Sequence, residues 1–264
     1  MKKILFVNQD MVPYVDETEV SKAGRTVAQK VQETGQEIRT FMPRWGTINE
    51  RRGQLHEVIR LSGLNISIND IDHPLIIKVA SIPGTKMQVY FIDNDEFFTR
   101  KGQVLDEDGK PYADNGERAA FFARGVIETI KKLRWVPDVI HCQGWMAAMI
   151  PVYAKVAYKE DPVMANVKVV TSVIEQPVQA ELNADTKDCI AYGDVTKDSL
   201  AKYADTMSSD ELMKLAVDYS DGVIKGSENA SDEIMDYAKA EGKAVLDYQG
   251  DDFAKAYVGF YDSL

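Results

Sequence analysis

Short apolar runs alternate with helix-spaced apolar positions from the start of the chain. Residues 2–8 form a β-branched-rich apolar run bounded by polar residues, which is typical of a buried central strand. Over residues 20–34 the apolar side chains recur at helical spacing, and Gly35 is placed to end that helix. Residues 38–42 form a second apolar run, which Pro43 closes. This opening predicts a βαβ unit with a right-handed crossover.

Between residues 57 and 93 the apolar positions no longer follow a helical period and follow the shorter period of strands. Four candidate strands follow one another there: 57–61, 65–68, 75–82 and 87–92. Pro83 and Gly84 mark a turn between the last two, because proline fixes φ and glycine accepts a positive φ. Such short connections favour antiparallel pairing. Residues 99–113 are rich in Gly, Asp and Lys and predict an exposed loop.

A long amphipathic helix is predicted over residues 114–134. Asp114 stands at its start with Glu117 three residues later, which predicts a capping box. Further elements follow in alternation: strand 138–142, helix 145–159, strand 167–173, helical segments within 180–219, strand 222–225 and helix 228–241. The repeated alternation predicts an α/β fold with a Rossmann-like, doubly wound, mostly parallel sheet, and we expect one domain over residues 1–264.

The tail over residues 250–264 carries its own helical pattern. Phe253, Ala256, Tyr257 and Phe260 follow the i, i+3, i+4, i+7 spacing of a helix with one apolar face. We therefore expect this tail to form a helix that docks on the rest of the chain.

Composition narrows the classes of function. A net charge of −11 opposes phosphate backbones and anionic lipids, so neither nucleic acid nor membrane is expected as a partner. Two cysteines without a CxxC pair and three histidines predict neither a disulfide framework nor a zinc site, and we expect no metal and no cofactor. The first apolar run is too short for a secretory signal or a membrane span, so a cytoplasmic location is predicted.

The nucleotide-binding fingerprints GxGxxG and GxxxxGK[ST] are both missing from the sequence. Lys22, Gly24 and Arg25 instead fall at the predicted start of the first helix, where free N–H groups and the helix dipole favour anions. Two interpretations stay open from spacing alone: a phosphate site, or a solvated basic end of a helix.

Several motifs in order resemble one known family. Residues 114–122 resemble D-N-x-x-R-F-x-x-F, and residues 135–145 resemble W-x-P-D-V-I-H-x-H-D-W. Residues 89–93 with 97–102 resemble the V-Y-F-I-D and Y-F-x-R-x-G block, and residues 216–221 with 227–234 resemble the A-D-x-V-x-T-V-S-x-x-Y-A-x-E-I region. The motifs belong to bacterial glycogen (starch) synthases, and the chain resembles the N-terminal half of these enzymes over nearly its whole length.

The resemblance implies one lobe of a two-lobed GT-B glycosyltransferase. Such an enzyme moves glucose from ADP-glucose to the non-reducing end of an α-1,4-glucan, and its first lobe mainly binds the acceptor. Lys22 and Gly24 match the family's K-x-G-G loop, whereas Arg25 replaces its second glycine. The resemblance therefore places Lys22, Gly24 and Arg25 beside the donor phosphates.

Other positions depart from the family pattern. In the H-D-W motif Gln143 replaces the histidine and Gly144 the aspartate, and residues 172–175 do not match T-x-H-N. His141 and Gln143 are candidate sugar-facing residues and Trp145 is a candidate substrate-binding residue, but no catalytic residue is assigned. Two alternatives remain: His141 as a buried histidine paired with a backbone carbonyl, and Trp145 as a core residue.

Two hypotheses about function follow. The first is a synthase-like glycosyltransferase domain that needs a separately encoded C-terminal half, because that half supplies the nucleotide pocket and the cations that stabilise the departing diphosphate. The second is a noncatalytic glucan-binding or regulatory protein derived from the synthase. Autonomous transfer, for instance by a homodimer, is the least favoured interpretation, since two acceptor-type lobes provide no nucleotide pocket.

Overall fold

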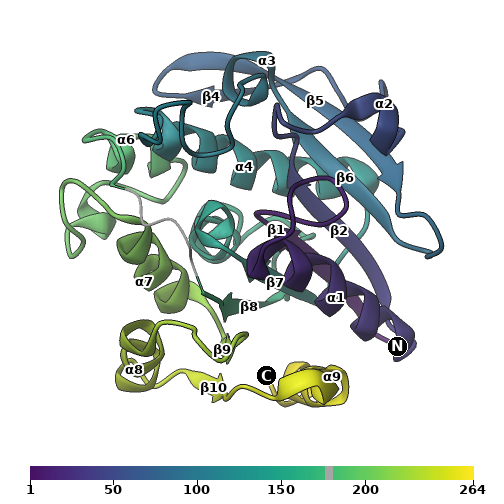
Figure 1. Ribbon diagram of the computed structural model, residues 1–264. Helices are drawn as coiled ribbons and strands as arrows, with labels where there is room; N and C mark the ends of the chain where they lie inside the picture. The colour runs from purple at the N-terminus through teal and green to yellow at the C-terminus, as the bar shows by residue number, and fades with distance from the viewer. Residues whose placement is uncertain (176–180) are drawn as a thin grey trace.

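A twisted mixed sheet runs through the centre of the protein (Figure 1). The computed structural model describes residues 1–175 and 181–264. Within these ranges the sheet has ten strands in the order β10-β9-β8-β7-β1-β2-β6-β5-β3, with β4 paired to β5. All neighbours from β10 to β6 are parallel. The predicted doubly wound, mostly parallel α/β sheet is confirmed.

Apart from the strand at Ala244–Leu246, the parallel strands are short and mostly buried, as their apolar runs predict. Their bounds are Lys3–Asn8 (β1), Glu37–Pro43 (β2), Gln88–Asp93 (β6), Val139–Gln143 (β7), Lys168–Val173 (β8), Gly222–Lys225 (β9) and Ala244–Leu246 (β10). The sequence pattern missed β10, which has only three residues at the sheet edge.

The antiparallel strands lie within residues 56–93, where the apolar positions follow the shorter period of strands. Its strands are His56–Glu57 (β3), Leu64–Ile68 (β4) and Ile71–Ser81 (β5), and β5 pairs antiparallel with β3, β4 and β6. The turn at Gly84, with φ +75°, joins β5 to β6 as predicted. The strand predicted over 57–61 is wrong beyond Glu57, because the chain turns there and the Leu61 amide donates to the Val58 carbonyl.

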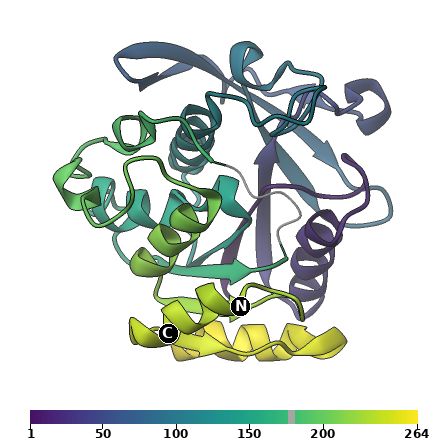
Figure 2. The ribbon, with the colours of Figure 1, turned by 60° about the vertical axis from the view of Figure 1, so that its left-hand side comes forward.

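Helices cover both faces of the sheet (Figures 1 and 2). Those with eight or more residues are Glu19–Glu33 (α1), Asn115–Leu133 (α4), Ser209–Tyr219 (α7), Asp232–Ala240 (α8) and Phe253–Ser263 (α9). Short ones are Glu50–Gly53 (α2), Asp95–Phe98 (α3), Ile150–Val152 (α5) and Thr186–Ile190 (α6). Helices α1 and α9 lie side by side on one face, whereas α4, α5 and α7 pack on the other. No helix in the described ranges is long and apolar enough to cross a membrane.

Two helix predictions need correction. Asp114 makes no side-chain cap on α4, because its carboxylate accepts from Nη1 of Arg100 at 2.7 Å instead. The helix predicted over 145–159 is divided into a 3-10 turn (Trp145–Ala147), α5 and a π turn (Tyr153–Ala157). Pro151 lies in the first turn of α5 and has no N–H to continue a preceding helix.

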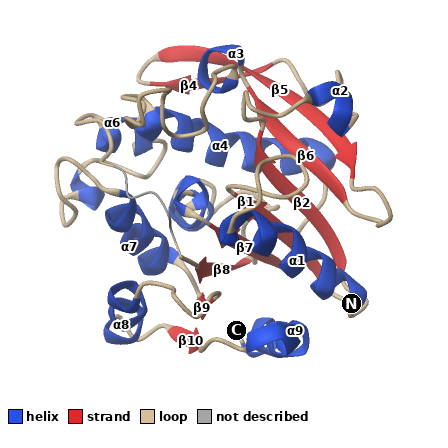
Figure 3. Cartoon of the chain, in the orientation of Figure 1, coloured by secondary structure: helices blue, strands red, loops and turns tan. Residues whose placement is uncertain are grey.

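The tail forms α9 and packs beside α1 (Figure 2). Its apolar face buries Phe253, Tyr257, Phe260 and Tyr261. Figure 3 shows that the segment before α9 is mostly loop. Residue 180, the first of the range predicted to hold helical segments, lies outside the described residues; α6 and α7 occupy part of the remainder.

Candidate functional site

One cavity of about 550 Å³ opens beside the carboxyl end of β1. It lies among the segment that follows β1, the segment after β2 with α2, and the turn after β5. We call it the Asp10 cavity; its lining includes Asp10, Tyr14, Asp16, Thr18, Thr47, Asn49, Arg52, Gln54, Ser81 and Gln103. In open α/β sheets, ligands bind at this edge because the strand ends direct their loops there.

Asp10 is the most buried carboxylate of this cavity. Its Oδ1 accepts from Nε1 of Trp45 at 2.8 Å and from Nε2 of Gln103 at 3.1 Å. Burial raises the pKa of Asp10 to about 6, while the hydrogen bond from Trp45 acts in the opposite direction. Asp10 is therefore mostly ionised at neutral pH, and its carboxylate can accept hydrogen bonds from a ligand.

The rest of the lining combines hydrogen-bonding side chains with one aromatic ring. Asn49, Gln54 and Gln103 carry amides that both donate and accept, and Arg52 only donates. Tyr14 adds a ring that packs edge-on against Phe91, with 4.9 Å between ring centroids. A ligand with many hydroxyl groups and apolar C–H faces fits this chemistry.

A second cavity, of about 340 Å³, lies beside α1 at the carboxyl ends of β8 and β9. We call it the Lys22 cavity; its charged lining residues are Glu19, Lys22, Glu175, Glu228 and Asp251. Residues from the tail close one side of it. Four carboxylates face one ammonium here, so the cavity carries excess negative charge that opposes a diphosphate.

Lys22 does not stand at the start of a helix. Helix α1 begins three residues earlier, at Glu19, and Thr18 and Ser21 close its first turn as a capping box. The Lys22 amide already donates to the Thr18 carbonyl at 2.9 Å. Its ammonium pairs with Glu17 at 3.0 Å and Glu19 at 3.8 Å. The Lys22 amide is therefore not one of the free N–H groups at this helix start, and contact of Lys22 with a donor phosphate stays a prediction.

Gly24 and Arg25 lie further along α1. A Cβ on Gly24 would come within 2.2 Å of the Asp10 carbonyl oxygen, so glycine is required for the helix to pack against the segment after β1. The Arg25 side chain is half-buried. Burial raises the pKa of Tyr14 to about 12, and the charge of Arg25 acts in the opposite direction. Contact of Gly24 or Arg25 with a donor phosphate stays a prediction.

His141 points into the face of the sheet that α9 covers. Its Nδ1 is hydrogen-bonded to the Tyr261 hydroxyl at 2.6 Å and its Nε2 to the Ser172 hydroxyl at 2.7 Å. Burial lowers the pKa of His141 to about 3, so the ring is neutral at physiological pH. The alternative of a buried histidine is confirmed, but its partners are two hydroxyl groups in place of a backbone carbonyl. A role of His141 towards a sugar stays a prediction.

Gln143 and Trp145 are also enclosed by the fold. Nε2 of Gln143 donates to the Val20 carbonyl at 3.1 Å, which ties β7 to the first turn of α1. Trp145, in the 3-10 turn that follows β7, is completely buried, and its Nε1 has no hydrogen-bond partner in the part of the chain that the structure describes. Neither side chain lines the Asp10 cavity or the Lys22 cavity, so the alternative of Trp145 as a core residue is the one that the packing favours.

Sequence reasoning did not single out Asp10, Trp45 or Gln103. A usable signal was present for Asp10, because the polar triplet 8–10 follows a buried strand directly and parallel strands direct such residues to one edge. Trp45 and Gln103 lie 35 and 93 positions away from Asp10. No local pattern could connect three residues so far apart.

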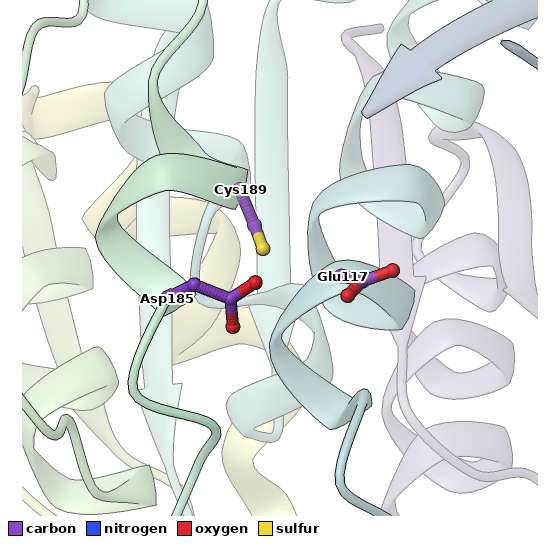
Figure 4. Close-up of side chains that lie close together, drawn as sticks. All are labelled: Glu117, Asp185 and Cys189. Carbon is purple, nitrogen blue, oxygen red and sulfur yellow. The ribbon is translucent and has the colours of Figure 1, made fainter. Parts of the chain in front are cut away.

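Three side chains of the types that ligate metal ions lie close together outside the two cavities. Glu117 of α4 faces Asp185 and Cys189 near α6, and their ligand atoms lie within 4.8 Å of one another (Figure 4). Burial raises the pKa of Cys189 to about 12, and the Asn69 amide donates to both Asp185 and Cys189. A protonated thiol is a poor metal ligand. This group therefore offers two carboxylates and a thiol that an ion would have to deprotonate.

Comparisons with known proteins point to one family. The profile of the family described as starch synthase catalytic domain matches residues 3–247. A glycogen synthase from Chlorobium limicola is 36% identical over 172 residues, covering 65% of this chain and 35% of the relative. A glycogen synthase from Chlorobaculum tepidum shows the same identity and coverage. The chain thus spans about a third of the length of these curated relatives.

A solved structure resembles the fold. The catalytic domain of starch synthase IV from Arabidopsis thaliana, bound to ADP and acarbose, superposes with a TM-score of 0.74 at 14% identity. The match covers 94% of this chain and 51% of that one. At this identity the similarity concerns the fold alone.

Proposed function

Because the chain belongs to the starch synthase catalytic domain family, we propose that it is the acceptor-binding lobe of a glycosyltransferase that moves glucose from ADP-glucose to an α-1,4-glucan. The lobe comprises residues 1–264 and binds the glucan in the Asp10 cavity. Transfer also requires a nucleotide-binding lobe equivalent to the C-terminal half of the synthase. We place the protein in the cytoplasm, where ADP-glucose is available.

The Asp10 cavity is the observation that carries this proposal. An ionised carboxylate at its base accepts hydrogen bonds from vicinal hydroxyl groups, and the surrounding amides of Gln54 and Gln103 can donate and accept. Tyr14 supplies an apolar surface for a sugar ring. The cavity volume of about 550 Å³ suits a short oligosaccharide.

The negative charge of the Lys22 cavity supports the need for a second, nucleotide-binding lobe. A departing ADP develops negative charge that must be stabilised by cations or hydrogen-bond donors. Lys22 is already paired with Glu17 and Glu19, and Glu175, Glu228 and Asp251 add further negative charge. The cations for the leaving group therefore have to come from the nucleotide-binding lobe.

Calorimetry with maltoheptaose tests acceptor binding. We expect saturable binding by the wild type, and about tenfold or greater weakening in Asp10→Asn, since a hydrogen bond to a charged group contributes about 1.5–3 kcal/mol. Lys22→Gln is the control variant, because Lys22 does not line the Asp10 cavity. Equal affinity in Asp10→Asn and the wild type would remove the Asp10 cavity as the acceptor site.

Transfer of radiolabelled glucose from ADP-glucose onto maltoheptaose tests the partner. We expect background incorporation by the chain alone, and incorporation after addition of a purified C-terminal half from a related glycogen synthase. Elongation by the chain alone would contradict the need for a partner.

A second function is favoured by one observation. His141, Gln143 and Trp145, which occupy the family's W-x-P-D-V-I-H-x-H-D-W motif, are all buried within this lobe. A lobe whose motif residues face inward can bind glucan without taking part in transfer. Glucan binding that persists while no C-terminal half restores transfer would favour this noncatalytic, regulatory role.

A further inference from the structure

Arg118 of α4 is a fully buried cation that forms no salt bridge among the described residues, although the Asp114 carboxylate acts to raise its pKa from a distance. Its Nε donates to the Phe97 carbonyl at 2.8 Å and its Nη1 to Oδ1 of Asn115 at 2.7 Å. Its Nη2 has no hydrogen-bond partner within residues 1–175 and 181–264. A buried charge without a counter-ion is costly, so an arginine here needs a reason beyond packing.

Aromatic rings surround the Arg118 guanidinium instead of acids. Its Cζ lies 5.2 Å from the centroid of the Trp45 ring, 5.1 Å from that of Tyr112 and 5.5 Å from that of Phe98. Burial lowers the pKa of Arg118 to about 10, which leaves it charged at neutral pH. The cation is therefore held mainly by ring faces, which attract it through their quadrupoles.

Trp45 connects this cation to the Asp10 cavity. Its indole is completely buried, and Nε1 donates to the Gln9 carbonyl at 2.9 Å and to Oδ1 of Asp10 at 2.8 Å. A cation over the indole face withdraws electron density from the ring and makes its N–H a stronger donor. Trp45 is thus the one side chain that lies between the Arg118 guanidinium and the Asp10 carboxylate.

The same turn of α4 also supports the other donor to Asp10. Nδ2 of Asn115 donates to the Val104 carbonyl at 2.9 Å, which fixes the residue next to Gln103. Nε2 of Gln103 then donates to Oδ1 of Asp10 at 3.1 Å. Because Oδ1 of Asn115 accepts from Arg118, both donors to the carboxylate are anchored at the start of α4.

We propose that Arg118 is a positioning residue for the Asp10 cavity: it orients Trp45, and with Asn115 it fixes the segment carrying Gln103, so that the Asp10 carboxylate is held ready for glucan hydroxyl groups. The glucan-binding part of this inference rests on the function proposed above. The positioning of Asp10 does not, because it concerns contacts within the lobe. The two can therefore fail separately.

The test measures the pKa of the Asp10 carboxyl by 13C NMR in protein labelled at aspartate, with Asp10→Asn to assign the signal. We expect Arg118→Met to raise this pKa by about half a unit or more, because a weaker N–H donor stabilises the ionised form less. Trp45→Phe, which removes the N–H and keeps a ring, should raise it at least as far. Asp16 and Arg52, the other charged groups lining the cavity, are the same in each of these variants.

Arg124→Met is the matched control. Arg124 is a second buried arginine of α4 and lies over the ring of Tyr192, away from the Asp10 cavity. We expect it to leave the Asp10 pKa unchanged even if it lowers thermal stability. A similar shift in both arginine variants would show a general structural effect and overturn the proposal.

A double variant distinguishes an effect of Arg118 that is transmitted to Asp10 through Trp45 from a direct electrostatic effect of Arg118 on the Asp10 pKa. If Arg118 acts through the indole, Arg118→Met adds little further shift in the Trp45→Phe background. Fully additive shifts, or an unchanged Asp10 pKa in a folded Arg118→Met protein, would overturn the proposal. Should Arg118→Met not fold, Arg118→Gln takes its place in the same cycle, because glutamine removes the charge and keeps an N–H donor for the Phe97 carbonyl.

Maltoheptaose calorimetry on the same variants then links positioning to binding. We expect weaker affinity in Arg118→Met and Trp45→Phe, with Arg124→Met unchanged. Shifted Asp10 pKa values without any maltoheptaose binding by the wild type would refute the proposed function and leave the positioning role intact. Wild-type binding with no change in the Arg118 and Trp45 variants would refute the positioning role alone.

Discussion

Acid should weaken this protein through His141. The ring is buried, its pKa is lowered from 6.5 to about 3, and it is hydrogen-bonded to Tyr261 and Ser172. A histidine kept neutral by burial contributes stability that is fully present above its unfolded pKa. That stability is lost as pH falls from about 6.5 towards 3, because the unfolded chain takes up a proton that the folded chain refuses.

The size of the effect follows from the two pKa values. Each pH unit between them lowers the free energy of unfolding by about 1.4 kcal/mol. Between pH of about 7.5 and about 5, His141 should therefore cost about 2 kcal/mol of stability. The figure holds for any folded pKa below about 4, since the unfolded pKa then sets the loss over this range.

Urea unfolding at both pH values measures this loss in the wild type and in His141→Gln. The variant should be less stable at the higher pH, because glutamine cannot replace both ring hydrogen bonds, and the gap should close by about 2 kcal/mol at the lower pH. His56→Gln serves as control, since His56 is exposed and should keep the wild-type pH dependence. An equal loss of stability on acidification in His141→Gln and the wild type would refute the reasoning.

Three further substitutions should change the free energy of unfolding, measured in urea. Gly24→Ala should cost about 1–3 kcal/mol by overpacking, because its Cβ would come within 2.2 Å of the Asp10 carbonyl oxygen. Asp93→Asn should cost about 3 kcal/mol, because this fully buried carboxylate pairs with Arg44 at 2.9 Å and with a lysine at 3.0 Å. Tyr261→Phe should cost about 1–2 kcal/mol, because it leaves a buried imidazole nitrogen unpaired.

Each of these substitutions has a control at a residue of the same type or in the same salt-bridge network. Gly259→Ala in α9 meets nothing within 4 Å and should be neutral or slightly stabilising. Glu50→Gln, at the exposed end of the Asp93 network, should cost much less than Asp93→Asn. Tyr248→Phe, whose ring is partly exposed before α9, should leave stability unchanged. If a control substitution lowers the free energy of unfolding as much as the substitution that it is matched with, the cause given for that substitution is wrong.

Periodicity alone determined the layered architecture. The apolar run of β1 and the helical pattern of α1 predicted a βαβ opening, and the later alternation predicted the parallel sheet. These predictions succeed because burying an apolar face requires the same local period in any setting. The family assignment likewise came from ordered motifs, which the profile over residues 3–247 confirms.

The starts of the helices and the make-up of the candidate site depended on tertiary contacts. Asp114 was predicted to cap α4 and pairs with Arg100, because a charged partner brought near by folding competes with the backbone N–H groups. Lys22 was predicted at a helix start and lies one turn inside α1, because Thr18 and Ser21 cap each other. One or two residues of shift decide which N–H groups remain free.

His141 shows most clearly what the sequence could not determine. Its motif placed it on a strand end, but only the packing of α9, which begins over a hundred residues later, brings Tyr261 onto its ring. Asp10, Trp45 and Arg118 are likewise distant in sequence and meet only across the sheet edge. A pattern records which side chains face inward, whereas the identity of their partners depends on how separate elements are brought together in three dimensions.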